Sequence, residues 1–212
     1  MRRLTILIGL VALALLGTPL LAAGDVNVFL GQKAFSEDLL DDFDLDKAFE
    51  YGAGVALDFE WPVMLTLDVL MASDDESFTY YDRGIGIYEY ELEVETTEIH
   101  LGARYAFLKE GKIQPYVGAG VAYVQADFSC EGECFASFRG GPSNIDFVDD
   151  SDVGFFADAG VLFRFAEHFN VGVDVRWSDA SAELEPSILR GSPPGDVDTG
   201  GLHYGVTFGY HW

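Results

Sequence analysis

Large apolar residues alternate with small or polar residues along most of this chain, with a period of two. The C-terminal segment shows this most clearly, because one side carries glycine, threonine and histidine and the other carries Leu202, Tyr204, Val206, Phe208, Tyr210 and Trp212. Successive side chains of a β-strand point to opposite faces, whereas an amphipathic helix repeats every 3.6 residues. The alternation therefore predicts an all-β fold in which each strand has one apolar and one polar face.

The alternation recurs in eight segments, which predict eight strands. They are residues 26–33, 49–61, 63–72, 97–107, 113–124, 155–165, 169–177 and 202–212. The intervening connections alternate in length, with long loops at 34–47, 73–91, 125–151 and 178–199 and short turns between them. In an antiparallel up-and-down barrel this order places all short turns at one rim and all long loops at the other.

The polar face decides which side of the barrel points outward. It is built mainly from glycine, alanine and threonine with isolated charges, whereas a face in water would carry many lysines and glutamates. An eight-stranded barrel has an interior just wide enough for side chains, which suits these small residues. Aromatic residues gather at the ends of the apolar face, as at membrane interfaces. We therefore expect a transmembrane barrel; the alternative is a water-soluble barrel that encloses the apolar face.

The N-terminus resembles a secretory signal. Arg2 and Arg3 precede an apolar run over residues 4–16, and Ala22 and Ala23 supply small residues for cleavage. The run is short for a membrane-spanning helix, which needs about 20 residues. The sequence thus predicts a signal peptide at 1–23 and a barrel domain at 24–212.

The charge of the chain is strongly negative, with 12 basic and 36 acidic residues and a net charge of −24. This excess repels nucleic acid. Many of the acids lie in the long loops, where none has the spacing of an EF-hand. Such loops are either simply solvated, or bind divalent cations that bridge to lipopolysaccharide phosphates. The acids are Asp38, Asp41, Asp42, Asp44, Asp46, Asp74, Asp75, Glu76, Asp82, Asp146, Asp149, Asp150 and Asp152.

Cys130 and Cys134 are the two cysteines of the chain. In an exported protein we expect them to form a disulfide, because thiols are oxidised outside the cytoplasm. Their spacing does not match a Cys-x-x-Cys redox motif, and the further ligands of a zinc site are not nearby in sequence.

The polar face carries charges of both signs, which should pair because an isolated buried charge is costly. The expected ion-pair network of the lumen comprises Asp58, Glu60, Glu98, Arg104, Asp158, Arg164, Asp174 and Arg176, with Asp58, Glu60, Arg104 and Arg164 toward the short-turn rim. Such a network either plugs the barrel or, if its pairs exchange partners, forms a gated path for small ions.

Enzymatic activity is a third possibility. His100 and His203 point inward on strands that are not neighbours, and their nearest plausible partners are Glu98 and Thr207. A catalytic triad needs a nucleophile within hydrogen-bond reach of its base, and no serine adjoins either histidine in sequence. We expect neither catalysis nor a cofactor.

Residues 114–123 (Gln-Pro-Tyr-Val-Gly-Ala-Gly-Val-Ala-Tyr) and the terminal strand resemble the eight-stranded barrels of the outer-membrane protein A type. The resemblance covers the chain after the signal and implies an assembly signal read by the barrel-assembly machinery. The matching residues are Tyr204, Val206, Phe208, Tyr210 and Trp212, with tryptophan where the family more often has phenylalanine. No peptidoglycan-binding domain follows, so a wall-anchoring role is not implied.

The expected function is that of a non-enzymatic outer-membrane barrel with a plugged lumen, which serves envelope integrity and surface contact through acidic loops. Expected partners are outer-membrane lipids, lipopolysaccharide, and the secretion and assembly machinery. The alternatives are a small ion channel and a barrel enzyme that modifies lipid A.

Overall fold

The computed structural model describes residues 23–36, 47–58, 63–82, 86–108, 111–132, 145–183 and 196–212. Eight strands form the main sheet: β1 (Gly24–Phe35), β2 (Lys47–Asp58), β3 (Val63–Asp82), β4 (Gly86–Ala106), β5 (Ile113–Gly132), β6 (Ile145–Phe165), β7 (Phe169–Asp179) and β10 (Gly201–His211). Two short strands, β8 (Ser181–Glu183) and β9 (Asp196–Asp198), pair with each other. In this part of the chain no helix is long and apolar enough to cross a membrane.

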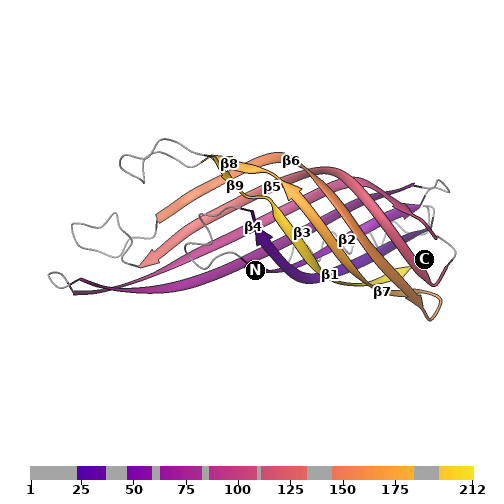
Figure 1. The fold of residues 1–212 in the computed structure, drawn as a ribbon, viewed down its shortest axis with the longest axis horizontal. Helices are drawn as coiled ribbons and strands as arrows, with labels where there is room; N and C mark the ends of the chain where they lie inside the picture. The colour runs from indigo at the N-terminus through magenta and orange to yellow at the C-terminus, as the bar shows by residue number, and fades with distance from the viewer. Residues whose placement is uncertain are drawn as a thin grey trace.

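The main sheet closes on itself in the order β1-β10-β7-β6-β5-β4-β3-β2 (Figure 1). Every neighbouring pair is antiparallel, and β1 completes the closure by pairing with β2 on one side and β10 on the other. The eight-stranded antiparallel barrel predicted by the period-two alternation is therefore confirmed.

The two faces of the wall divide as the alternation predicted. Outward side chains are apolar and exposed, as for Leu101 (57%), Val173 (55%) and Phe208 (50%). Inward side chains are buried and mostly polar or small, including His100 and His203, but the inner face also encloses a few large apolar residues such as Phe29 and Phe156. A continuous apolar surface around a barrel is incompatible with water but suits the hydrocarbon of a bilayer.

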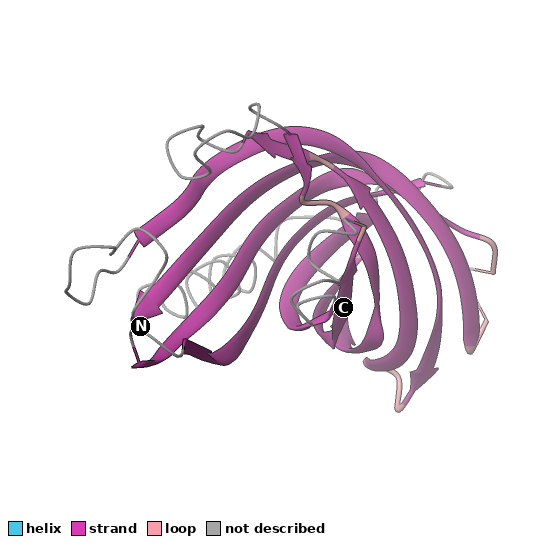
Figure 2. Cartoon of the chain, turned by 60° about the vertical axis from the view of Figure 1, so that its left-hand side comes forward, coloured by secondary structure: helices cyan, strands magenta, loops and turns pink. Residues whose placement is uncertain are grey.

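Two of the predicted long loops are wrong in extent, because much of 73–91 and 125–151 is strand. β3 and β4 continue to Asp82 and Gly86, and β5 and β6 continue to Gly132 and Ile145, so that the four strands project beyond the others (Figures 1 and 2). For β4 the signal was present in the sequence, because Tyr88, Tyr90, Leu92 and Val94 alternate with four glutamates, but here the apolar parity is reversed and Val94 is buried instead of facing outward. The backbone groups of these strands are paired in ladders, which keeps the extension ordered.

The turn between β6 and β7 is strained. Ala166 and Glu167 have φ angles of 49° and 61°, in the left-handed region that favours glycine or asparagine. The turn joins the two strands directly above the pair Phe165 and Phe169.

Candidate functional site: the polar lumen

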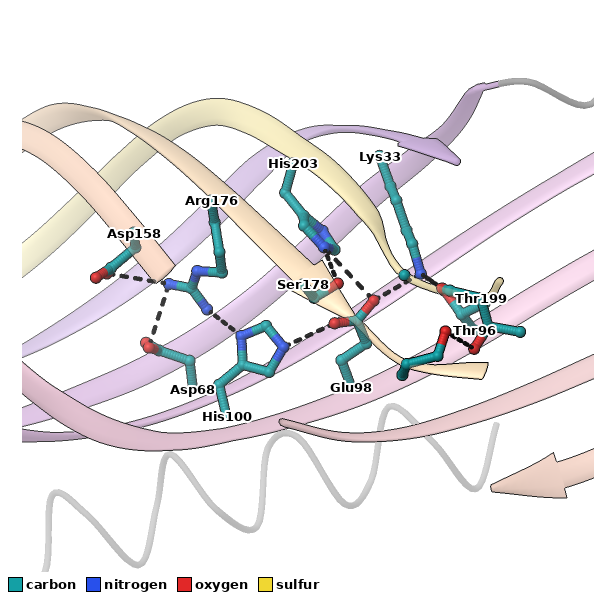
Figure 3. Close-up of polar contacts among 12 residues, drawn as sticks. Lys33, Asp68, Thr96, Glu98, His100, Asp158, Arg176, Ser178, Thr199 and His203 are labelled. Atoms are coloured by element: carbon teal, nitrogen blue, oxygen red, sulfur yellow. Dashed lines mark hydrogen bonds and ion pairs between the residues drawn. The ribbon is translucent and has the colours of Figure 1, made fainter. Parts of the chain in front are cut away.

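Inward side chains from all eight strands of the barrel form two bonded groups in its interior (Figure 3). The central cluster lies midway along the lumen and consists of Asp68, Arg104, Tyr116, Asp158, Asp174 and Arg176. The rim cluster lies toward the long-loop rim and consists of Lys33, Glu50, Thr96, Glu98, Ser178, Thr199 and His203. His100 joins the two clusters.

The central cluster crosses the lumen with two guanidinium groups between carboxylates of facing strands. Arg104 Nη2 lies 2.6 Å from Asp158 Oδ2, and Arg176 Nη2 lies 3.2 Å from Asp68 Oδ2. Each arginine also reaches the other's carboxylate, at 3.9 Å for Arg104–Asp68 and 3.8 Å for Arg176–Asp158. Four strands are thus tied across the interior by charge-assisted bonds.

The tyrosine of this cluster binds a third carboxylate. The Tyr116 hydroxyl donates to Asp174, and the Arg104 guanidinium lies 4.3 Å from the centre of the Tyr116 ring. Tyr116 belongs to the segment 114–123, and it places one aromatic ring of that segment inside the barrel.

Glycines provide the space that the central carboxylates need. Gly54 lies opposite Asp68 in the β2–β3 register, and Gly118 lies opposite Asp158 in the β5–β6 register. A Cβ added at either glycine would collide with the carboxylate of its partner. The small residues of the inward face therefore permit the ion pairs rather than merely filling a narrow interior.

The rim cluster is built around Lys33, whose side chain is fully buried. Its ammonium donates to Glu98 Oε1 at 2.6 Å, to the Thr199 carbonyl at 2.7 Å and to Thr96 Oγ1 at 3.3 Å, which uses all three of its protons. Lys33 was not among the residues predicted for the ion-pair network. The signal was present, since Val28 and Leu30 face outward and fix the parity of the strand.

His100 lies between Glu98 and Arg176. Its Nε2 is 2.7 Å from Glu98 Oε2, and its Nδ1 is 2.8 Å from Arg176 Nη1. A guanidinium only donates hydrogen bonds, so Nδ1 accepts and the ring carries its proton on Nε2. The geometry therefore assigns a neutral imidazole that donates to Glu98.

His203 connects a carboxylate with a serine. Its Nδ1 lies 2.7 Å from Glu50 Oε1, and its Nε2 lies 2.9 Å from Ser178 Oγ. This is the order of nucleophile, base and orienting acid found in serine hydrolases. The sequence suggested Glu98 and Thr207 as partners of the histidines, whereas His203 bonds to Ser178, which is distant in sequence but which the β7–β10 register places opposite Gly201, two residues from His203. Ser178 is buried, and Glu98 Oε1 also lies 3.5 Å from His203 Nε2.

The predicted network members separate into three groups. Glu98, Arg104, Asp158, Asp174 and Arg176 belong to the clusters or to the bonds that join them. Arg104 was expected near the short-turn rim but bonds in the centre, because its side chain reaches toward Asp158. Arg164 lies at the short-turn rim, 3.7 Å from Asp25 and 3.3 Å from His211 Nδ1. Asp58 ends β2 at that rim, and Glu60 lies outside the described residues.

The remaining expectations concern metal binding, the disulfide, the acidic loops and the assembly signal. Within the described ranges, no group of three or more His, Cys, Asp or Glu residues could hold a metal ion. Cys134 and the side chain of Cys130 lie outside those residues, as do the acids at 38–46, so the disulfide stays a prediction. Val206, Phe208 and Tyr210 of the expected assembly signal lie exposed on the outer face of β10, and its reading by the assembly machinery also stays a prediction.

A small cavity lies among the groups of the lumen. It has a volume of about 20 Å³ and lies beside the central cluster, among residues that include Asn27, Asp68, Arg104, Arg176 and Thr207. That volume holds about one water molecule.

Comparison with known proteins gives the family. The model of the outer membrane protein beta-barrel domain matches residues 8–212. The structure is similar to OprG from Pseudomonas aeruginosa, with a TM-score of 0.57, 16% identity, and coverage of 91% of this chain and 97% of that one. It is also similar to the N-terminal barrel of OprF from the same species, with a TM-score of 0.51, 16% identity, and coverage of 91% and 98%.

A third similar structure is Ail of Yersinia pestis in complex with the heparin analogue sucrose octasulfate. Its TM-score is 0.52 at 13% identity, and the match covers 91% of this chain and 100% of that one. No curated protein sequence matches the chain significantly. Identities this low support the fold alone, whereas the family model spans nearly the whole sequence. The chain therefore belongs to the outer membrane protein β-barrel domain family and lies in the bacterial outer membrane.

Proposed function

We propose that this protein is a non-enzymatic barrel with a closed lumen, which strengthens the envelope and contacts the cell's surroundings through its acidic exterior. The closed lumen is supported by the two arginines, Arg104 and Arg176, that Asp158 and Asp68 hold across the interior. An ion passing through must separate these buried partners, and breaking one buried pair costs about 3–5 kcal/mol. Because the pairs span four strands, the same bonds resist deformation of the barrel wall.

Contact with the surroundings is supported by the acidic part of β3–β6 that projects beyond the other strands. Asp75 lies opposite Glu93 and Ser77 lies opposite Glu91 in the β3–β4 register, and Glu91 is exposed. With a net charge of −24, this exterior attracts basic surfaces and repels polyanions. Ail was crystallised with a polysulfated ligand; the charge here favours partners of the opposite sign.

Two measurements test the proposal. Purified protein in planar bilayers should show no stable conductance steps, and regular steps would instead favour the ion channel. Cells that display the protein should adhere to polylysine-coated beads more than to heparin-coated beads. The variant Asp75→Asn/Glu76→Gln/Glu91→Gln removes three carboxylates of the projection and should weaken this preference, with Ser77→Ala as the control. If the neutralised variant adheres to the polylysine beads as strongly as the parent does, the projection has no surface-contact role.

The Ser178–His203–Glu50 geometry favours a second candidate function, the hydrolysis of an ester at the long-loop rim. Attack requires a substrate carbonyl beside Ser178 Oγ, but Ser178 is 1% exposed. A fluorophosphonate probe separates the two candidates in the folded protein. Labelling that disappears in Ser178→Ala would favour the enzyme, and absence of labelling would favour the closed, non-enzymatic barrel.

A further inference from the structure

His100 joins the two clusters of the lumen, and its ring nitrogens face groups of opposite character (Figure 3). Nε2 lies 2.7 Å from Glu98 Oε2, and Nδ1 lies 2.8 Å from Arg176 Nη1. A carboxylate accepts a hydrogen bond, whereas a guanidinium only donates one, so the observed bonds require an uncharged ring. The ring is stacked on Phe156, with 4.6 Å between the centroids and 9° between the planes, which restricts its reorientation. The bond between His100 and Arg176 therefore depends on the protonation state of His100.

A second proton on this imidazole would lie on Nδ1. The Nδ1–H of His100 and the Nη1–H of Arg176 would then face each other as two donors on two cations, which repel. His203 does not meet this conflict, because its Nδ1 faces the Glu50 carboxylate and its Nε2 faces the Ser178 hydroxyl. A carboxylate accepts a hydrogen bond and a hydroxyl can accept or donate one. Of these two histidines, His100 is therefore the one whose protonation changes the network.

Arg176 has a second carboxylate within reach, on its own strand. Its Nε is buried without a hydrogen-bond partner among the described residues and lies 3.7 Å from Asp174 Oδ1. A movement of about 1 Å brings this nitrogen within hydrogen-bond distance of the carboxylate. The small cavity of the central cluster is lined by Arg176, Asp68 and Asp174, so the guanidinium has space to move.

Asp68, whose Oδ2 lies 3.2 Å from Arg176 Nη2, has a replacement donor in His100. Asp68 and His100 lie directly opposite each other in the β3–β4 register, and the Cβ atoms of such a pair are about 5 Å apart. A proton on Nδ1 would turn this nitrogen into a donor within reach of Asp68. Both carboxylates remain bonded in this second arrangement, so the network has two satisfied states.

The charged and titratable groups around His100 favour the uptake of a proton. They come from every strand of the barrel and are Lys33, Glu50, Asp68, Glu98, Arg104, Tyr116, Asp158, Asp174, Arg176 and His203. Carboxylates outnumber the lysine and arginine side chains among them, five against three. Burial opposes a further positive charge, but this surplus of carboxylates offsets part of that penalty. A second proton on His100 would thus reduce the net charge of the two clusters.

We propose that His100 is a proton-sensitive switch in the bond that ties opposite walls of the barrel. While His100 is neutral, Arg176 of β7 is held on Asp68 of β3, and these strands lie on opposite sides of the closed barrel. Protonation of Nδ1 repels Arg176, which moves to Asp174 on its own strand. Asp68 then accepts from His100 on the neighbouring strand β4, and the tie across the lumen is lost. This inference rests on the proposed closed lumen and adds that the bonding inside it responds to acid.

The experiment uses the folded full chain, labelled with ¹⁵N, in lipid nanodiscs at about pH 7.5 and about pH 5, on either side of the pH of about 6.5 at which an ordinary histidine titrates. The ¹⁵N shifts of the two ring nitrogens report which of them carries a proton. We expect His100 to carry one proton, on Nε2, at the higher pH and two protons at the lower pH. The Nε–H signal of Arg176 should shift over the same range, as this group bonds to Asp174.

His100→Gln is the decisive variant, because the amide can still accept from Arg176 and donate to Glu98 but cannot titrate. The Arg176 signal should not move with pH in this variant. His168→Gln removes an exposed histidine of the β6–β7 turn and is the matched control, which should behave as the parent does.

The stability of the barrel gives a second measurement. The folded protein binds one proton fewer at His100 than the unfolded chain while the ring stays neutral, so its stability should fall as the pH falls. The unfolding constant of the parent should therefore rise by up to tenfold per pH unit more than that of His100→Gln. His168→Gln should keep the pH dependence of the parent.

Two results would overturn the switch. One is a His100 ring that keeps its single proton on Nε2 at about pH 5, and the other is an Arg176 signal that still moves with pH in His100→Gln. Regular conductance steps at about pH 7.5 would instead remove the closed lumen of the proposed function, whichever way His100 titrates. A gel-mobility shift on heating would verify that His100→Gln still forms the barrel.

Discussion

Replacing Lys33 with methionine tests the rim cluster most directly. The substitution keeps most of the side-chain volume but removes the cation that lies 2.6 Å from Glu98 Oε1, and both residues are at most 1% exposed. Glu98 would then be a buried carboxylate without its cation, at a cost of about 3–5 kcal/mol. His100 Nε2 still donates to Glu98 Oε2, so the lower half of that range is expected. The Thr199 carbonyl also loses a donor.

The double variant Lys33→Met/Glu98→Gln separates charge from packing. It removes both members of the pair, and the amide oxygen can still accept from His100. We therefore expect it to be about 2 kcal/mol more stable than Lys33→Met alone, although it carries one more substitution. The free energies of unfolding follow from urea titrations in lipid vesicles, monitored by the fluorescence of the three tryptophans. A loss below about 1 kcal/mol in Lys33→Met, or additive losses in the double variant, would refute the assignment of Lys33 as the essential counter-ion of Glu98.

Three further predictions follow from other parts of the barrel. Gly118→Val should destabilise the barrel by about 1–3 kcal/mol in the same titration, because the new side chain collides with Asp158, whereas the neighbouring Ala119→Val points to lipid and should have little effect. Glu167→Gly should stabilise the β6–β7 turn by up to about 1 kcal/mol by relieving its positive φ; a loss of stability would show that the turn is not strained. Chelation with EDTA should leave the melting temperature unchanged, as expected for solvated carboxylates, and a fall would instead indicate cations bridging the acids.

The membrane-spanning part of the barrel was predictable because the bilayer imposes its own pattern on the sequence. An outward residue such as Leu101 or Val173 must be apolar, and its neighbours must fit a narrow interior. That requirement ends at the membrane surface. Glu91 and Glu93 belong to a strand as regular as the one below it, and they alternate with Tyr90, Leu92 and Val94. The alternation was therefore present beyond the bilayer, but its apolar residues take the inward parity, so it could not be joined to the outward apolar row of the membrane-spanning part.

The contacts inside the lumen depend on register, which sequence alternation does not determine. Parity alone places Ser178, His203 and Glu50 on the inner wall, but their meeting requires β10 to pair with β7 so that Gly201 lies opposite Ser178. Shifting that pairing by two residues would preserve every inward and outward assignment and would separate the serine from the histidine. The same holds for Lys33, which reaches Glu98 across the lumen from a strand that is not its neighbour. The period-two alternation of the sequence thus predicts which residues line the lumen. Which of these residues bond to one another depends on the strand register in the closed barrel.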